Sequence, residues 1–215
     1  TGAGTQGDAA GDVLTGIENL IGGTGADTLT GDAGGNRIDG AAGNDTLVGG
    51  AGADTLIGGT GTDTASYTAS SDAVQVNLAT GTGSGGDAEG DTLATIENVT
   101  GSDYADTLTG DTAANRLDGG AGDDTLVGGA GADTLVGGTG DDVYAWASPG
   151  EVILELAGEG TDTILSPVTC VLTPEVERLV LTGEDPVDGT GNGLDNCLAG
   201  NGSANALSDD AGSDT

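Results

Sequence analysis

The strongest constraint on this chain is a strict period of nine residues between Gly22 and Ser66. The stretch divides without remainder into GGTGADTLT, GDAGGNRID, GAAGNDTLV, GGAGADTLI and GGTGTDTAS, which follow the pattern G-G-x-G-x-D-x-U-x, where U is a large apolar residue. Position six of the five units is occupied by Asp27, Asn36, Asp45, Asp54 and Asp63. A fixed short period predicts a solenoid, in which each repeat packs on its neighbours.

The same pattern returns between Gly101 and Ala145. Position six of this second block is occupied by Asp106, Asn115, Asp124, Asp133 and Asp142. A longer period lies above the first, because residues 7–30 align with 86–109 at an offset of 79. The chain begins inside one such module and stops at position seven of a nonapeptide, so we expect it to be a segment of a longer protein.

The pattern predicts an all-β protein, a parallel β-roll or β-helix solenoid with two regular blocks of five repeats, connectors made of strands and a degenerate third block. No stretch carries a sustained period of 3.6, so little helix is expected. We expect six parts: a connector end with a degenerate repeat (1–21), the first block (22–66), a β connector with a degenerate repeat (67–100), the second block (101–145), a β-rich connector (146–190) and a degenerate, truncated third block (191–215).

Alternation of apolar residues predicts strands in the connectors. Val74, Val76 and Leu78 alternate with polar neighbours, which is typical of a strand with one buried face. Tyr144 and Trp146 follow directly at the end of the second block, and we expect them to form a small satellite core that closes it.

The connector after the second block carries a further alternating run. Val152, Leu154 and Leu156 alternate with Ile153 and Glu155, which predicts a strand that buries the first three and turns Ile153 to the other face. The stretch 168–183 is expected to form a strand, a turn and a second strand.

The charge of the chain excludes several classes of partner. It has 36 Asp and Glu against three Arg, no Lys and no His, for a formal charge of -33. Three cations cannot form a basic patch for nucleic acid or for anionic lipid. No run of 18 apolar residues is present, so no membrane insertion is expected, and the N-terminal residues show no signal peptide. So acidic a composition would favour disorder unless the charge is neutralised, and the regular period argues for a fold.

The spacing explains how neutralisation can occur. Three residues of each unit, such as Thr28-Leu29-Thr30, form a short strand, and the glycine-rich remainder forms a tight turn with inward carbonyls. If two units make one coil, position six of one unit lies about one strand spacing, roughly 4.8 Å, from position six two units later. Carboxylates that close repel one another, and a cation between them reverses this. Several oxygen ligands, some from the backbone, favour Ca2+ over Mg2+ or Zn2+.

The two blocks resemble the RTX calcium-binding nonapeptides, G-G-x-G-x-D-x-U-x, of the repeats-in-toxin family, which secreted proteases, lipases, cytolysins, adhesins and surface-layer proteins share. The resemblance covers 22–66 and 101–145 well, and 7–15, 86–94, 157–165 and 191–215 in degenerate form. It implies a parallel β-roll that is disordered without calcium and folds on binding several Ca2+ ions. It also implies type I secretion to the cell exterior, directed by a C-terminal signal that this segment lacks.

The resemblance also implies a set of calcium ligands. The side-chain ligands are the position-six residues of both blocks. Backbone carbonyls at positions one and three complete each shell, and the expected ones belong to Gly22, Thr24, Gly40, Ala42, Gly49, Ala51, Gly119, Ala121, Gly128 and Ala130. Each position-six residue is expected to share a site with its counterpart two units later, as Asp27 does with Asp45 and Asp45 with Asp63.

Some positions depart from the consensus. Asn36 and Asn115 keep an oxygen but lose the charge, so the sites that they share should be weaker, and the region of Asn196 and Asn205 is expected to be poor in calcium. Asp12, Asp91 and Asp162 stand at position six of degenerate units and serve either as ligands or as turn caps. Asp123 and Asp141, at position five, are expected to be solvated.

Other reactive residues suggest no catalysis. Glu18, Glu97 and Glu177 each lie alone in an apolar run, where a surface or edge-capping role is expected rather than a catalytic one. Cys170 and Cys197 have no His to activate them, which excludes a thiol enzyme. They form either a disulfide or two free thiols; the sequence leaves both open.

Three classes of function fit the sequence. The first is a calcium-binding structural segment of a secreted or cell-surface bacterial protein, serving as an extender or as a surface-layer or matrix component, with other copies or other surface proteins as partners. The second is the non-catalytic tail of a secreted enzyme or toxin, and the third is an adhesin module that binds a ligand. The repetition of whole modules favours the first, because long surface proteins iterate such units.

Overall fold

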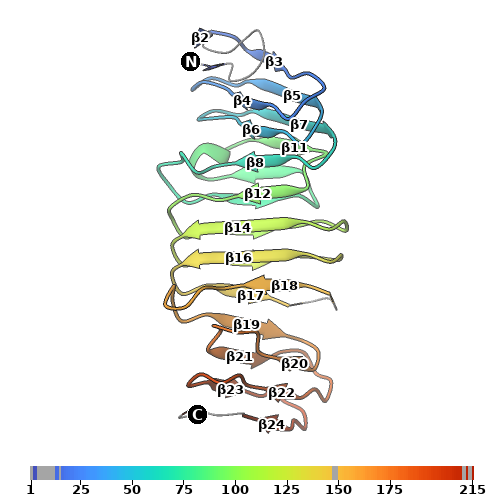
Figure 1. The fold of residues 1–215 in the computed structure, drawn as a ribbon, viewed down its shortest axis with the longest axis vertical. Coiled ribbons are helices and arrows are strands. Elements are labelled where there is room, and N and C mark those ends of the chain that lie inside the picture. The colour runs from blue at the N-terminus through green and yellow to red at the C-terminus, as the bar shows by residue number, and fades with distance from the viewer. Residues whose placement is uncertain (1, 4–12, 15, 147–149, 210–211, 213–214) are drawn as a thin grey trace.

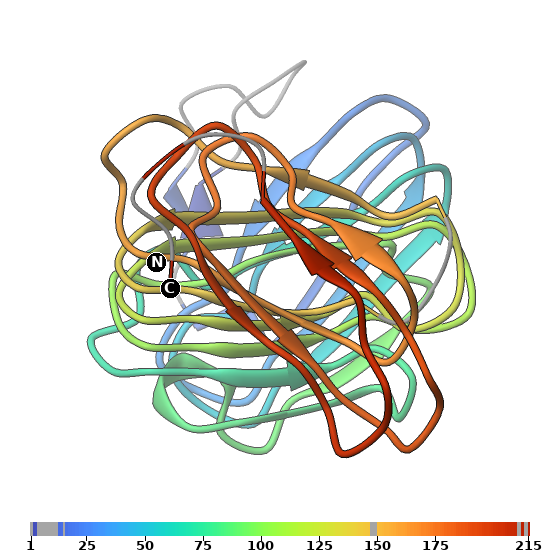
Figure 2. The same cartoon turned by 90° about the horizontal axis from the view of Figure 1, so that it is seen from below.

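Short strands stacked along one axis make up this molecule. The structure is a computed structural model and describes residues 2–3, 13–14, 16–146, 150–209, 212 and 215. The strands lie across the long axis and follow one another from the N-terminal to the C-terminal end (Figure 1). Seen along that axis, the successive coils overlie one another (Figure 2). The expected all-β parallel β-solenoid is therefore confirmed, and the described residues contain no α-helix.

Two sheets form the walls of the solenoid. The larger has twelve strands among the described residues. In spatial order they are β3 (Asn19–Ile21), β5 (Arg37–Ala42), β7 (Thr55–Thr60), β11 (Thr92–Ala94), β10 (Thr82–Ser84), β9 (Gln75–Asn77), β13 (Thr107–Thr109), β15 (Thr125–Val127), β17 (Val143–Ala145), β19 (Thr163–Ser166), β21 (Arg178–Leu181) and β23 (Cys197–Ala199).

The opposite wall has seven strands in the described part of the chain. They are β4 (Thr28–Thr30), β6 (Thr46–Val48), β8 (Thr64–Ser66), β12 (Asn98–Thr100), β14 (Arg116–Ala121), β16 (Thr134–Thr139) and β18 (Val152–Leu154). Smaller elements are β1 (Gly2–Ala3) with β2 (Val13–Leu14), the three-stranded sheet of β20 (Cys170–Val171), β22 (Gly189–Thr190) and β24 (Leu207–Ser208), and the 3-10 helix η2 (Gly86–Ala88).

Each repeat pairs with the repeat two units later. β4 lies parallel to β6 with Leu29 opposite Leu47, and β5 lies parallel to β7 with Ile38 opposite Leu56. The offset of 18 residues is two nonapeptides, so two units make one coil. The predicted pairing of alternate units is confirmed, and it sets the register of every position-six residue.

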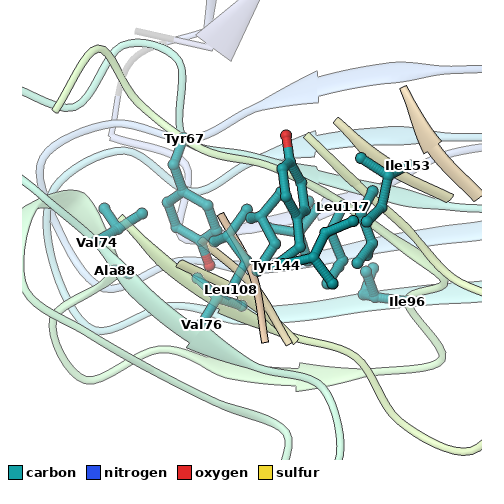
Figure 3. Packing of buried hydrophobic residues seen from close by; sticks show 14 of the residues in the cluster. Tyr67, Val74, Val76, Ala88, Ile96, Leu108, Leu117, Tyr144 and Ile153 are labelled. Carbon is teal, nitrogen blue, oxygen red and sulfur yellow. The ribbon is translucent and has the colours of Figure 1, made fainter. Parts of the chain in front are cut away.

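Position eight of the repeats supplies the core. Ile38, Leu47 and Leu56 in the first block are fully buried, as are the counterparts in the second block, Leu108, Leu117, Leu126, Leu135 and Tyr144. Figure 3 shows Leu108 and Leu117 packed in this core, with the rings of Tyr67 and Tyr144 beside them. Positions seven and nine face outward because side chains alternate along a strand. One apolar residue in nine is therefore enough for a continuous core.

The connector between the blocks shifts the repeats from one wall to the other. It inserts β9, β10 and β11 into the twelve-stranded sheet but only β12 into the other sheet. The odd-numbered repeats therefore lie in the seven-stranded sheet in the first block and in the twelve-stranded sheet in the second. The 79-residue module is visible nonetheless: Ala3 pairs with Val13 in the β1–β2 hairpin, and Thr82 pairs with Thr92 in the β10–β11 hairpin, 79 residues on.

One predicted strand has its faces reversed. Ile153 is the buried residue of β18, with 6% of its surface exposed, whereas Val152, Leu154 and Leu156 are 48%, 47% and 70% exposed. Pairing decides the face, because Leu135 of β16 lies opposite Ile153 and holds it at the core position. The prediction assumed that the face with more apolar residues is buried. The pairing of β18 with β16 decides the buried face instead.

The prediction of a satellite core at the end of the second block is also wrong. Tyr144 belongs to the main core, and Trp146 is partly buried against it. The stack does not close there, since β17 pairs onward with β19 and β19 with β21. The strand predicted through Val76 is confirmed as β9, and the strand, turn and strand of 168–183 as β20 and β21.

The two cysteines are free thiols in this structure. Cys170 is buried in the three-stranded sheet and Cys197 is exposed in the twelve-stranded one, so the alternative of a disulfide is not realised. Burial raises the pKa of Cys170 to about 11, which keeps it protonated at neutral pH. Among the described residues, no helix has the length and apolar character needed to cross a bilayer.

Candidate metal centre

Acidic side chains form a ladder along each wall of the solenoid. The residue just before each strand is position six of its repeat, and stacking brings these residues one above another. The first ladder follows the twelve-stranded sheet and contains Asn36, Asp54, Asp91, Asp106, Asp124, Asp142, Asp162 and Glu177. The second ladder follows the seven-stranded sheet and contains Asp27, Asp45, Asp63, Glu97, Asn115 and Asp133.

We call each residue of a ladder a rung. Hydrogen bonds from neighbouring coils fix one carboxylate oxygen, Oδ1, in many of the Asp rungs. The backbone N–H of Asp27 donates to Oδ1 of Asp45 at 2.8 Å, and that of Asp45 donates to Oδ1 of Asp63 at 2.8 Å. The first ladder repeats the arrangement, with Asp106 donating to Asp124 and Asp124 to Asp142, both at 2.7 Å. One oxygen of each accepting Asp is thus bonded to the neighbouring coil, which fixes the orientation of its side chain.

In six of the Asp residues of the ladders the second carboxylate oxygen has no protein partner. Oδ2 is buried without a hydrogen bond in Asp45, Asp54, Asp63, Asp124, Asp133 and Asp142. A buried carboxylate oxygen left unpaired is strongly unfavourable. Its repetition at six equivalent positions indicates a ligand that supplies the missing interaction.

Position-one glycines bring backbone oxygens to the same place. A Cβ atom on Gly40 would overlap Oδ2 of Asp45 and would lie 2.6 Å from the carbonyl oxygen of Gly58 in the next coil. A Cβ on Gly119 would overlap Oδ2 of Asp124 and would lie 2.8 Å from the carbonyl oxygen of Gly137. Only glycine leaves this space open, and the space is bounded by carboxylate and carbonyl oxygens. Such a donor set fits Ca2+, which takes six to eight oxygen ligands.

Electrostatics without a cation are unfavourable. Burial, with the charge of neighbouring rungs adding to it, raises the pKa of Asp124 to about 8 and that of Asp142 and Asp162 to about 6, although backbone N–H donors oppose the rise. Burial likewise raises the pKa of Asp91 to about 6 and raises the pKa of Asp54, Asp63 and Asp133. A divalent cation beside these carboxylates would favour their charged form and so oppose all these shifts.

The two asparagines of the ladders, unlike many of the aspartates, have both side-chain polar atoms hydrogen-bonded within the protein. Oδ1 of Asn36 accepts from Asp32 N–H at 2.8 Å, and its Nδ2 donates to the Ile17 carbonyl. Asn115 makes the same pair of bonds, with Asp111 and with Glu97. Both ends of the amide are therefore satisfied by the protein. This supports the prediction that these rungs hold calcium more weakly.

The degenerate third block follows the same rule. Asn196 accepts from Asn192 N–H at 2.7 Å, and Asn205 donates to the Val187 carbonyl at 2.7 Å. Amide hydrogen bonds replace the unpaired carboxylate oxygens in this region. A part of the solenoid that is poor in calcium stays a prediction, and these bonds support it.

The structure describes two of the three Asp residues at position six of the degenerate units. Asp91 and Asp162 are buried rungs of the first ladder, accepting from the N–H groups of Asp54 and Asp142. Asp12 lies outside the described residues. Asp123 and Asp141 are exposed, as expected for solvated residues.

The predicted backbone ligands fall into two groups. Position-one residues, with Gly22, Gly49 and Gly128 beside those already described, lie against the carboxylates of their own repeats. At position three, Ala42 and Ala121 end β5 and β14. Thr24, Ala51 and Ala130 lie in bends. Calcium coordination by any of these carbonyls stays a prediction.

The ladders include two glutamates for which the sequence predicted a surface or edge-capping role. Glu97 accepts from Asp63 N–H at 2.8 Å, and Glu177 accepts from Asp162 N–H at 2.9 Å. The signal was present, because Glu97-Asn98-Val99 places an acid two residues before a core residue, as Asp does in the nonapeptide. Each glutamate continues a ladder through a connector that lacks the glycine-rich turn.

Comparison with known proteins agrees with this geometry. The family model described as the RTX calcium-binding nonapeptide repeat matches residues 12–47, 30–65, 94–126 and 109–144. The two regular blocks are RTX repeats. The matched repeats imply Ca2+ at several sites along the β-roll.

Other comparisons add less. A search of curated proteins found no match. Among solved structures, the crystal structure of the extracellular lipase LipA from Serratia marcescens aligns at 19% identity with a TM-score of 0.32, covering 88% of this chain and 33% of that one. This chain thus spans about a third of the length of that lipase.

Proposed function

We propose that this chain is a structural segment of a secreted or cell-surface protein, which folds into a rigid β-roll as Ca2+ fills the two ladders. The observation that carries the proposal is the row of buried Oδ2 atoms without partners. In each of these residues the companion Oδ1 accepts from a backbone N–H of the preceding coil, and at Asp45 and Asp124 a glycine carbonyl of the next coil borders the same space. No protein group satisfies these oxygens, and calcium matches their chemistry.

The exterior of the cell is the compartment that suits this mechanism. Secretion by the type I route is typical of proteins with RTX repeats. A chain of charge -33 that meets millimolar calcium only outside the cell would stay expanded before export and become compact afterwards. Binding that occurs only in the folded state drives folding by mass action.

A structural role follows from what the acids do. The Asp residues of the ladders accept backbone N–H groups from neighbouring coils and so hold the coils together. The repetition of the module at 79 residues builds length rather than a unique site. We propose that the segment serves as an extender or as a surface-layer or matrix component and carries no catalysis of its own.

Calorimetric titration with metal ions tests the proposal. Several Ca2+ ions should bind per chain, and Mg2+ at the same concentration should bind far more weakly, because Mg2+ requires a strict octahedron. An Asp123→Asn variant, altered at an exposed carboxylate outside the ladders, should keep the full number of ions. Binding of one ion or none, or equal binding of Mg2+, would refute the proposed function.

A further inference from the structure

An acidic cluster at the end of the second block differs from the repeat sites. Asp142, Glu155 and Asp162 each place a carboxylate oxygen within 4.8 Å of the other two. Asp142 precedes β17 and Asp162 precedes β19 in the twelve-stranded sheet, whereas Glu155 follows β18 of the opposite sheet. Three carboxylates from both walls of the solenoid therefore converge on one point, where a repeat site brings together two from one wall.

Two residues of this cluster carry a buried carboxylate oxygen that has no hydrogen-bond partner. The Asp142 side chain is fully buried, and its Oδ2 has no hydrogen-bond partner, while its Oδ1 accepts from Asp124 N–H. Oε2 of Glu155 is also buried and without a partner. Desolvated carboxylate oxygens at such short range repel one another, and a bound cation would balance their charge.

A tyrosine replaces the leucine found at this position in other repeats. The Tyr144 hydroxyl donates to Oε1 of Glu155, and Oε2 of Glu155 stays free for a ligand. A Cβ on Gly137 would overlap Oδ2 of Asp142 and the Tyr144 hydroxyl, whereas at Gly119 the carbonyl of the next coil lies at 2.8 Å. At this rung the protein thus supplies an anchored glutamate in place of a glycine carbonyl.

We propose that Asp142, Glu155 and Asp162 form a three-carboxylate Ca2+ site with the highest affinity in the described chain, in which Tyr144 positions Glu155. Affinity for Ca2+ rises with the number of charged ligands and with the rigidity of the site. This site fills first and ties β18 of one wall to β17 and β19 of the other. The inference rests on the proposed function, because it ranks one site among several calcium sites.

The single tryptophan of the chain reports on this site. Trp146 follows β17, four residues after Asp142, and its backbone N–H donates to the carbonyl of Leu165 in β19 at 2.9 Å. Tryptophan fluorescence in a Ca2+ titration, and tryptophan-sensitised Tb3+ luminescence, therefore follow this site. Calorimetry on the same chain gives the mean affinity of all sites.

In the unaltered chain, the tryptophan signal should reach half-saturation at a Ca2+ concentration about 10-fold or more below the calorimetric mean. Glu155→Gln should raise that midpoint by about 10-fold or more, since even outer-shell changes cost 10–100-fold in metal affinity. The matched control is Glu159→Gln, which removes the same charge from the same loop outside the cluster; it should shift the midpoint by less than about twofold.

Two results would overturn the inference. One is a tryptophan midpoint at or above the calorimetric mean in the unaltered chain, which needs no variant to fold. The other is an unshifted midpoint in Glu155→Gln with its circular dichroism in calcium intact. Several bound ions together with either result would leave the proposed function standing, whereas no calcium binding at all would remove both.

Discussion

Asp45 should contribute more to calcium-dependent stability than Asp27, because it lies between two rungs. Its Oδ1 accepts from Asp27 N–H, and its own N–H donates to Asp63. Asp45 is 1% exposed, and its Oδ2 is unpartnered. Asp27 is partly exposed, and its Oδ2 accepts locally from Gly23 N–H. Asp45→Ala therefore removes a ligand from two sites, and Asp27→Ala removes one from a single site.

The expected magnitudes follow from linkage. A site held at 100 times its dissociation constant contributes about 2.7 kcal/mol, so Asp45→Ala should cost roughly 5 kcal/mol and Asp27→Ala about half as much. Asp45→Ala also leaves the Asp27 N–H unpaired, which adds about 1–3 kcal/mol. The difference between the variants is large against the total stability of a domain, about 5–15 kcal/mol.

Two measurements separate the variants. Urea unfolding in excess calcium gives the loss of free energy, and calorimetric titration should show two ions lost for Asp45→Ala against one for Asp27→Ala. Asp123→Ala serves as a control for removal of a carboxylate outside the ladders. Equal losses of stability and of bound ions in Asp45→Ala and Asp27→Ala would refute the sharing of rungs.

Three further outcomes are expected. Leu126→Ala, at a fully buried position, should lower the free energy of unfolding in calcium by about 2–5 kcal/mol, measured in urea; a loss below about 1 kcal/mol would contradict a packed core. Gly119→Ala should remove calcium from its rung, seen as a lower calorimetric stoichiometry, because its Cβ would overlap Oδ2 of Asp124, whereas Gly25→Ala, with open space, should not. In chelator, structure should be gained in acid. Folding raises the pKa of Asp124 to about 8 and that of Asp142 to about 6, from the unfolded value of 3.8. The stability that their protonation gives the folded chain is therefore fully present below pH 3.8 and is lost as the pH rises through 6 and 8. A β signal at about pH 5 that is no stronger than at about pH 8.5 would count against this prediction.

The period of nine was enough to predict the solenoid and its register. Each repeat pairs with the repeat two units later, and this pairing fixes where every position of the repeat lies. Position eight therefore lies in the core and position six lies just before each strand. The same rule corrected the face of β18, where one residue pairs with the core and its apolar neighbours are exposed.

Features without a period were not predictable. The shift of repeats between walls depends on how many strands a connector adds, and the β9–β10–β11 insertion follows from turns that the repeat pattern does not contain. The convergence of Glu155 on Asp142 likewise depends on stacking between distant coils. Glu97 and Glu177, by contrast, could have been assigned to the ladders from their place before a core residue.

The central claim is that calcium folds this chain, and circular dichroism with small-angle scattering, in calcium and in chelator, tests it most directly. In chelator the radius of gyration should approach that of an unfolded chain of this length, roughly 50 Å, with little β signal. Calcium should reduce the radius well below that value and produce the β signal of the stacked strands. An unchanged β signal and radius after complete removal of calcium would contradict the account.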